Sequence, residues 1–507
     1  MICVGFDGSS AASAPLDALR AFGPGAVILF GRNAAPADRL RGLIGALRGL
    51  GDPPPLIAVD QEGGRVERFH DGVAALPSAM AFGAAGDVDL AARAAMLLGR
   101  DLARLGVTAD LAPVADLSLQ PRSRVIGTRA FGDDPQRVAA LSAAFAAGLE
   151  RAGVAAAFKH FPGHGSTAAD SHVALPRVAA DRATLRARDL VPFAHGIAAG
   201  VASLIVSAHV VVEAFDAERP ATLSRAILTE LLRGELGFAG VVATDCLEMD
   251  AIARGTGTVQ GAVEALVAGA DLLLISHHLE LAHQAADAIV DAIESGRLPE
   301  DRLREAHARV AHLRRRFASP ATPIGDADEN APLEAAQRAP TRIAGDPRLR
   351  TGKPVTVISF EGVAGDNAAA SGAGRAVEPP SLSAALRRRG WKSELMRVAL
   401  EPAAEDLELL LEHVPALGER EFVVVTRDAH VAPPQRAAVA RILAAAPEAV
   451  IVSARSPYDV CEWPQARRVL CTYGDGAIAF EGCADVLSGR APLRGSLPVH
   501  VDGVAVR

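Results

Sequence analysis

The chain has 507 residues, of which 50% are hydrophobic and 22% are charged, a composition typical of ordinary globular proteins and not of disordered or fibrous ones. Its net charge of −8 comes from 60 acidic and 52 basic residues without a long block of one sign, so we expect neither a nucleic acid nor an anionic membrane as its partner. The length is enough for about three domains, or for two if one of them is an α/β barrel.

The N-terminal segment and the cysteines predict a cytoplasmic protein. No apolar run approaches the roughly 20 residues that cross a bilayer, and residues 1–7 lack the basic and apolar segments of a signal peptide. The five cysteines are widely spaced and form no CxxC pair, so we expect reduced thiols. Only three of the 52 basic residues are lysines, which makes the position of Lys159 unusual.

Eight short apolar runs of strand length occur in the first 280 residues, and each is followed by enough chain for a helix. Such runs are typical of parallel strands buried on both faces, and the segments between them show helical patterns. Eight successive strand and helix units predict an α/β fold, a TIM-like (β/α)8 barrel. The strands are expected at residues 2–6, 26–30, 56–59, 107–112, 154–158, 203–206, 240–243 and 271–275.

A second α/β pattern follows the predicted barrel. After a helical run at 302–317 the chain becomes Pro-containing and then polar, which indicates a linker. Strands are then expected at 355–360, 422–426, 449–453 and 469–473, with a helix at 435–446. The sequence therefore predicts a barrel domain at 1–318, a linker at 319–353, and a smaller C-terminal α/β sandwich domain with an open sheet at 354–507.

Polar side chains follow several of the predicted barrel strands. In barrels of this type the working groups lie just beyond the carboxyl ends of the strands, so these side chains are expected at one rim. Glycines at 63–64, 163 and 165 permit sharp turns there. The predicted rim residues are Asp60, Asp116, Lys159, His160, His209 and Asp245.

Asp170 and His172 are two residues apart in a predicted loop. A carboxylate so close can fix the tautomer of the imidazole and raise its basicity, as a proton-transfer group requires. Each feature also has a purely structural explanation: a single Asp after a strand, such as Asp245, commonly caps a helix, and Asp-Ser-His is compatible with an Asx turn. The combination of these residues at one rim favours the functional interpretation.

A metal site is the alternative for the same loop, because His160, His164, Asp170 and His172 could supply nitrogen and oxygen ligands. Their spacing lies on a loop interrupted by Pro and Gly, and Lys159 would add positive charge beside the ion. We therefore expect no metal and no organic cofactor, and an activity that chelators do not change.

Six segments resemble, in order and spacing, motifs of the β-N-acetylglucosaminidases (β-hexosaminidases) of glycoside hydrolase family three. The resemblance covers about residues 1–318, and the segments 484–489 (ADVLSG) and 495–499 (GSLPV) are similar to the C-terminal α/β sandwich of the long members of that family. The six segments are 60–66 (DQEGGRV), 125–132 (VIGTRAFG), 159–165 (KHFPGHG), 170–172 (DSH), 220–224 (PATLS) and 240–245 (GVVATD).

The resemblance implies roles for residues at matching positions. Asp245 would be the nucleophile, and His172, oriented by Asp170, would be the general acid and base. A histidine has an unperturbed pKa of about 6.5, so it needs no large shift to exchange protons near neutrality. The hydroxyls of the terminal sugar would be held by Asp60, Arg68, Arg129, Lys159 and His160, with His209 as a weaker candidate.

The resemblance therefore implies a retaining exo-acting β-N-acetylglucosaminidase, with peptidoglycan (muropeptide) recycling as its role. The expected partner is a small carbohydrate substrate, and the chain is expected to be a monomer or a homodimer. A β-glucosidase or β-xylosidase of the same family, a sugar-binding module without catalysis and a metal-dependent hydrolase are the alternatives. Water and inorganic phosphate both stay open as acceptors. Cys246, next to the expected nucleophile, departs from the pattern of the family.

Overall fold

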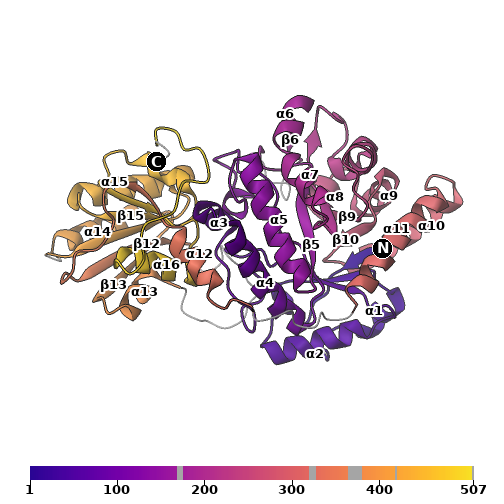
Figure 1. The fold of residues 1–507 in the computed structure, drawn as a ribbon, viewed down its shortest axis with the longest axis horizontal. Helices are drawn as coiled ribbons and strands as arrows, with labels where there is room; N and C mark the ends of the chain where they lie inside the picture. Colours follow the sequence, from indigo (N-terminus) through magenta and orange to yellow (C-terminus); the bar gives the residue numbers. More distant parts are fainter. Residues whose placement is uncertain (168–174, 319–326, 363–379, 417–418, 505–507) are drawn as a thin grey trace.

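The computed structural model describes residues 1–167, 175–318, 327–362, 380–416 and 419–504, which form a closed barrel beside a second, open sheet (Figure 1). All neighbouring barrel strands are parallel. Each strand overlaps one of the eight predicted apolar runs, so the TIM-like barrel is confirmed. In barrel order the strands are β1 (Ile2–Val4), β10 (Leu272–Ile275), β9 (Val241–Cys246), β7 (Leu204–Ser207), β5 (Ala155–Phe161), β4 (Ala109–Asp110), β3 (Leu56–Val59) and β2 (Ala26–Leu29).

Helices connect the barrel strands and surround them (Figure 1). Two short helices, at 182–187 and 191–198, follow one another after β5, and a proline lies in the first turn of the second. None of the helices in the described ranges is both long and apolar enough to span a bilayer. The helices are α1 (Leu16–Phe22), α2 (Ala37–Arg48), α3 (Ala79–Ala85), α4 (Val88–Leu105), α5 (Pro135–Arg151), α6 (Arg182–Ala187), α7 (Val191–Ala198), the π-helix η4 (Ala226–Glu235), α8 (Asp250–Ala253), α9 (Thr258–Ala268), α10 (Leu279–Glu294) and α11 (Glu300–Arg316).

The interior of the barrel is filled by small and branched apolar side chains, with alanine on five of its strands. Val310 and Leu313 of α11 belong to the same buried cluster, together with Phe317, so the last helix closes one end of the barrel. Because the interior is packed, a ligand can bind only at the open end, among the loops that follow the carboxyl ends of the strands.

The second sheet has six strands, and four of them correspond to the predicted strands of the C-terminal domain. The two strands that sequence patterns missed, β11 and β13, form its two edges, and both are only partly buried. Edge strands lack the continuous apolar run of a central parallel strand. In sheet order the strands are β11 (Thr341–Ala344), β16 (Arg468–Cys471), β15 (Val450–Ser453), β14 (Glu421–Thr426), β12 (Val355–Glu361) and β13 (Ser393–Ala399).

The predicted linker at 319–353 needs a correction, because part of it is regular structure. Residues 331–338 form helix α12 (Ala331–Arg338), and β11 pairs antiparallel with β16 as part of the second sheet. The limits of the two domains stay a prediction. The other helices of this part are α13 (Leu382–Arg388), α14 (Ala404–Ala416), α15 (Pro433–Ala445) and α16 (Ala477–Leu487).

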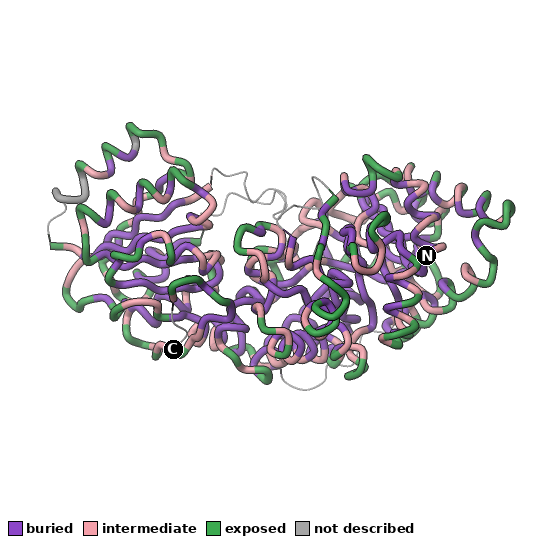
Figure 2. The backbone as a smooth tube through the Cα atoms, turned by 90° about the horizontal axis from the view of Figure 1, so that it is seen from above, coloured by how far each residue is buried: buried purple, intermediate pink, exposed green. Residues whose placement is uncertain are grey.

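The two sheets do not have fully separate cores. Met80, Ala81 and Ala84 of α3, which lies between β3 and β4 of the barrel, belong to the apolar cluster that contains Ile358 and Phe360 of β12. The Ser78 hydroxyl also donates a hydrogen bond to the carbonyl of residue 473 (2.6 Å). Buried backbone runs through the centres of both halves (Figure 2). The contact between the halves is therefore apolar and well packed.

Packing between α7 and β5 gives a first prediction. A Cβ atom at Gly196 would lie 2.4 Å from the ring of Phe158, whereas one at Gly42 of α2 would meet nothing within 4 Å. We expect Gly196→Ala to lower the free energy of unfolding by about 1–3 kcal/mol through overpacking. The matched variant Gly42→Ala should raise it by roughly 0.5–1 kcal/mol. Urea unfolding measures both, and equal shifts of the two midpoints would contradict the described packing.

Candidate active site

A cavity of about 1020 Å³ lies at the carboxyl ends of the barrel strands and extends to the second sheet. Asp60 follows β3, whereas Lys159 and Asp245 lie on β5 and β9. Residues of the second sheet's loops complete the lining. Of the residues predicted for the site, those that line this cavity are Asp60, Arg68, Arg129, Lys159, His160 and Asp245.

Three other predicted site residues stand apart from this set. Asp170 and His172, the expected acid and base, lie outside the described residues, so their roles stay predictions. His209 is fully buried and is not part of the lining. Its Nε2 lies 2.9 Å from the carbonyl oxygen of Cys246, and because a carbonyl only accepts, this nitrogen carries the hydrogen. His209 thus holds the backbone beside Asp245.

Local irregularities in two strands bring consecutive side chains into the cavity. The pairing of β5 with β7 shifts between Lys159 and Phe161, and the pairing of β9 with β10 shifts between Ala243 and Cys246, the stretch that contains Asp245. In a regular strand neighbouring side chains point to opposite faces, and an extra residue re-aims them. Both pairs, Lys159 with His160 and Asp245 with Cys246, accordingly line the cavity.

Lys159 is the centre of a buried charge network. Its Nζ lies 2.7 Å from Asp60 Oδ1 and 2.7 Å from Glu62 Oε1, and Arg129 binds the two oxygens of Glu62 through Nε (2.8 Å) and Nη2 (2.7 Å). The Lys159 and Glu62 side chains are only 4% and 5% exposed, whereas Asp60 is 17% exposed. Arg68 Nη2 approaches the other oxygen of Asp60 at 3.8 Å.

The charges of this network stabilise one another against burial. Burial alone would raise the pKa of Glu62, but Arg129 and Lys159 outweigh it and hold that pKa well below its usual range. Burial would likewise lower the pKa of Lys159, and the carboxylates of Asp60 and Glu62 raise it instead. Glu62 and Lys159 are therefore both charged at neutral pH. Glu62 was not among the predicted site residues, although it lies in the motif 60–66.

His160 is oriented by a second buried carboxylate. Asp116 Oδ2 accepts hydrogen bonds from the backbone N–H of His160 (3.1 Å) and from its Nδ1 (2.7 Å), and Asp116 Oδ1 accepts one from the backbone N–H of His164 (2.6 Å). Burial opposes ionisation of Asp116, but these contacts outweigh it and lower its pKa. Asp116 was expected at the rim; it is buried behind the lining and positions the loop.

His164 also lines the cavity. Its Nδ1 lies 2.6 Å from the Thr167 hydroxyl, and its ring centre lies 6.0 Å from that of His160 in an edge-to-face arrangement. Burial lowers the pKa of His164 below its usual range, although the carboxylate of Asp116 acts in the opposite direction. A neutral imidazole is therefore available here near pH 7.

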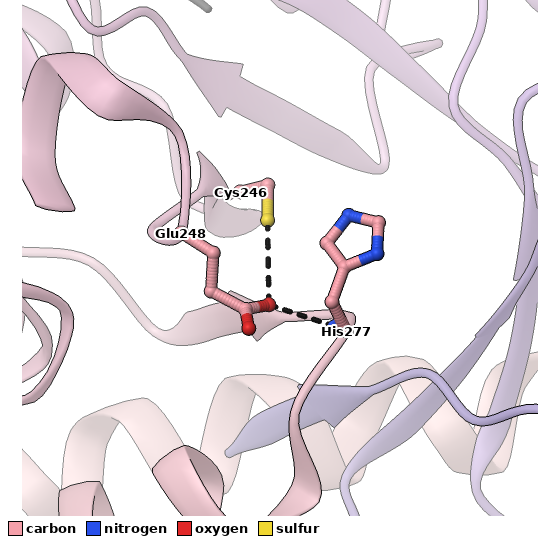
Figure 3. A group of neighbouring side chains, drawn as sticks. All are labelled: Cys246, Glu248 and His277. Carbon is pink, nitrogen blue, oxygen red and sulfur yellow. Dashed lines mark hydrogen bonds between the residues drawn. The ribbon is translucent and has the colours of Figure 1, made fainter. Parts of the chain in front are cut away.

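Within the described ranges, the group that comes nearest to a metal site is formed by Cys246, Glu248 and His277. One ligand atom each of Cys246, Glu248 and His277 lies within 4.8 Å of the others. In Figure 3 the Cys246 thiol (3.7 Å) and the backbone N–H of His277 (2.7 Å) both point to the Glu248 carboxylate. Arg32 Nη1 lies 3.3 Å from His277 Nδ1 and repels a cation. The Glu248 carboxylate therefore serves to hold the backbone of the loop at His277 in place.

Cys246 itself has a protonated thiol. Burial raises its pKa to about 11, and its Sγ lies 3.1 Å from the Ser276 hydroxyl. A thiol in this state is a weak nucleophile at neutral pH. The departure from the family pattern at this position therefore adds no reactive thiolate beside Asp245.

Residues of the second sheet's loops in the lining were missed by sequence reasoning. Arg427 and Asp428 follow β14, and Arg455 follows β15. The rule that polar residues gather beyond the carboxyl ends of parallel strands applies to this open sheet as well. Applied there, it would have found all three.

The chain is similar to known glycosidases over its whole length. Residues 13–313 match the model of the glycosyl hydrolase family 3 N terminal domain. A "Beta-hexosaminidase" of Xylella fastidiosa is 43% identical over 296 residues, 57% of this chain and 87% of that protein. A glycoside hydrolase family 3 beta-N-acetylglucosaminidase from Paenibacillus sp. superposes with a TM-score of 0.91 and 34% identity, covering 99% of this chain and 97% of its own.

The charge network gives the second prediction. We expect Glu62→Gln to lower the free energy of unfolding by about 3–5 kcal/mol at pH 7, because the buried Arg129 loses its carboxylate partner and Lys159 loses one of its two. The pKa of Glu62 is depressed in the folded state, so its contribution is present above the unfolded pKa of about 4.3 and is lost as the pH falls. The deficit of the variant, measured by urea unfolding, should therefore shrink at acidic pH.

An exposed ion pair provides the control for this variant. Glu300 lies 2.6 Å from Arg304 with a side chain that is 63% exposed, so Glu300→Gln should change stability by no more than about 0.5 kcal/mol. Equal losses for the two variants would contradict the central place of Glu62.

Proposed function

Because this chain belongs to glycosyl hydrolase family 3, we propose that it is a retaining exo-acting β-N-acetylglucosaminidase that hydrolyses terminal N-acetyl-β-glucosaminides. The observation that supports this most directly is that Asp245 lines the same cavity as Asp60 and Lys159. The proposal is supported by the names of two similar proteins, since the Xylella relative is called a beta-hexosaminidase and the Paenibacillus enzyme a beta-N-acetylglucosaminidase.

In the proposed reaction, the Asp245 carboxylate attacks the anomeric carbon while His172 donates a proton to the departing oxygen. The C–O bond to the leaving group breaks, and a covalent glycosyl-enzyme forms. His172 then removes a proton from water, which displaces Asp245 and restores the original configuration. Most retaining glycosidases use a second carboxyl for the proton transfers. A histidine oriented by Asp170 would take its place here.

The buried charge network has a clear use in this reaction. Lys159 and Arg129 hold Glu62 and Asp60 in one arrangement before the sugar arrives, so little reorganisation is needed on binding. Hydroxyl groups of the terminal sugar would bind to Asp60 and Lys159. Binding energy gained there can distort the ring toward its oxocarbenium-like transition state.

The biological setting is part of the proposal. We propose that the substrate comes from peptidoglycan and that the enzyme works in muropeptide recycling in the cytoplasm. All five cysteines, which lie in the described residues, are free thiols, as is usual in a reducing compartment. No cofactor has a place in the proposed steps.

The third prediction tests the nucleophile. Asp245→Asn should lower kcat/KM for an aryl N-acetyl-β-glucosaminide on the order of 10⁴-fold, because it removes the covalent route. The control Asp287→Asn, on the exposed face of α10, should leave the rate as in the wild type. Proton NMR of the first product formed by the wild type should show the β-anomer. An α-anomer, or an unchanged rate in Asp245→Asn, would refute the proposed mechanism.

The fourth prediction concerns the proton donor. His172→Ala should lower kcat/KM by about 10²–10⁴-fold for chitobiose, whose leaving sugar needs protonation, and far less for an aryl glycoside with an acidic leaving group. The comparison of the two substrates measures the assistance that the leaving group receives. Equal losses on both would show that His172 is not the general acid.

A further inference from the structure

The cavity has two ends of opposite charge. Around Asp245 its lining carries three cations and five carboxylates, which suits a positively charged transition state. Where the barrel loops meet the second sheet, the lining carries four guanidinium groups and two carboxylates. The residues of this second end are Arg65, Arg124, Arg427, Arg455, Asp428 and Glu401.

Two of these arginines converge on one carboxylate. Arg427 Nε donates to Asp475 Oδ2 at 2.8 Å, and Arg455 Nε donates to the same oxygen at 2.9 Å. Burial would raise the pKa of Asp475, but the two guanidinium groups outweigh it and lower that pKa. The Asp475 carboxylate thus holds the two guanidinium groups side by side, and its single negative charge does not neutralise both of them.

The outer edges of both guanidinium groups are available to a ligand. Arg427 Nη1 binds the Ser359 hydroxyl (3.0 Å) and the carbonyl of Phe360, and Arg455 Nη1 lies 3.5 Å from Asp428 Oδ2. Among the described residues, neither Nη2 group has an acceptor within hydrogen-bond distance. Both arginines line the cavity, and Arg427 is only 6% exposed.

Arg65 adds a third positive group from the barrel. Its Nη2 donates to the carbonyl of Arg124 (2.5 Å). Burial lowers the pKa of Arg65, and the charges of Arg129, Asp428 and Arg455 act on that pKa too, so Arg65 lies close to these groups. Asp428 has a left-handed backbone (φ 52°), which is uncommon for a residue other than glycine. Such conformations gather at sites where a side chain has to be aimed.

We propose that Arg427 and Arg455, together with Arg65 of the barrel, form an oxyanion subsite that binds a carboxylate or phosphate group on the leaving-group side of the scissile bond. This proposal rests on the proposed function, because it places the terminal sugar at Asp245. A guanidinium group matches the planar geometry of a carboxylate and can bind its two oxygens at once. The preferred substrate then carries a negative charge on its second sugar.

The size of the cavity agrees with a second subsite. Pockets of about 300–1,000 Å³ typically hold ligands of drug size, and this cavity reaches the upper end of that range. A single terminal sugar at Asp245 would leave the end with the arginines empty. In a disaccharide with an acidic leaving sugar, the terminal sugar would lie at Asp245, where positive charge develops in the transition state. The negative charge of the leaving sugar would then lie at the arginines.

A pair of substrates that differ only in charge tests the subsite. The probes are N-acetylglucosaminyl-N-acetylmuramic acid and its neutral carboxyl methyl amide. Wild-type enzyme should prefer the acid in kcat/KM by about tenfold or more, since a hydrogen bond between charged groups contributes that much. Arg455→Gln should abolish most of this preference, and Arg455→Lys should restore part of it through charge alone.

Controls separate this proposal from the function on which it rests. Arg441→Gln, a surface variant of the same domain whose arginine pairs with Glu408 at 2.8 Å, should keep the wild-type preference. Failure of the wild type to cleave a neutral aryl N-acetyl-β-glucosaminide would overturn the proposed function itself. Cleavage of both probes with equal kcat/KM, or a preference that survives in Arg455→Gln, would overturn a leaving-group carboxylate as the ligand.

Inorganic phosphate tests whether the subsite binds a free oxyanion and not a carboxylate on the leaving sugar. Millimolar phosphate that changes the rate on the neutral aryl substrate in the wild type, but not in Arg455→Gln, would support the subsite with a free oxyanion as its ligand. No effect of phosphate, together with equal kcat/KM for the two probes, would overturn the oxyanion subsite altogether.

Discussion

The site depends on one buried interaction, the ion pairs that Lys159 makes with Asp60 and Glu62. A lysine that is almost fully removed from water would lose its proton without compensating charges. Here two carboxylates at 2.7 Å retain it, and Arg129 keeps Glu62 ionised in turn. The side chains that would bind hydroxyl groups are therefore fixed before any ligand enters.

This network also ties together parts of the chain that are far apart. Asp60 and Glu62 follow β3, Arg129 lies between β4 and β5, and Lys159 is within β5. Replacing a buried ion pair by apolar residues often costs little stability, so the energetic gain of such a pair is modest. Its persistence here is better explained by preorganisation of the cavity than by stability.

Much of this arrangement could be predicted from the sequence, and the limits of prediction have physical causes. The eight apolar runs identified the barrel because a strand buried on both faces has a clear signature. The edge strands β11 and β13 have no such signature, and so no strand was predicted at either place, β11 lying within the predicted linker. Asp60 and Lys159 were found because they follow apolar runs, whereas Glu62 lies among equally polar neighbours.

The residues after the strands of the second sheet could be found by the same rule, but their place at the barrel cavity could not be predicted. A pattern along the chain shows where each strand ends, but not which strand ends of two sheets face each other across a gap. The position of Arg427 and Arg455 beside the barrel depends on how the domains pack, which is set by apolar contacts of α3. His209 illustrates the converse, since a polar residue after a strand can serve the backbone and not the ligand.

The shared core has a consequence for dissecting the molecule. Because Met80, Ala81 and Ala84 are packed in the apolar cluster of the second sheet, a chain cut after α11 would expose this apolar surface of α3 to water. Such a fragment would tend to self-associate even if every group around Asp245 were in place. The C-terminal half is thus a solubility partner of the barrel as well as a wall of its cavity.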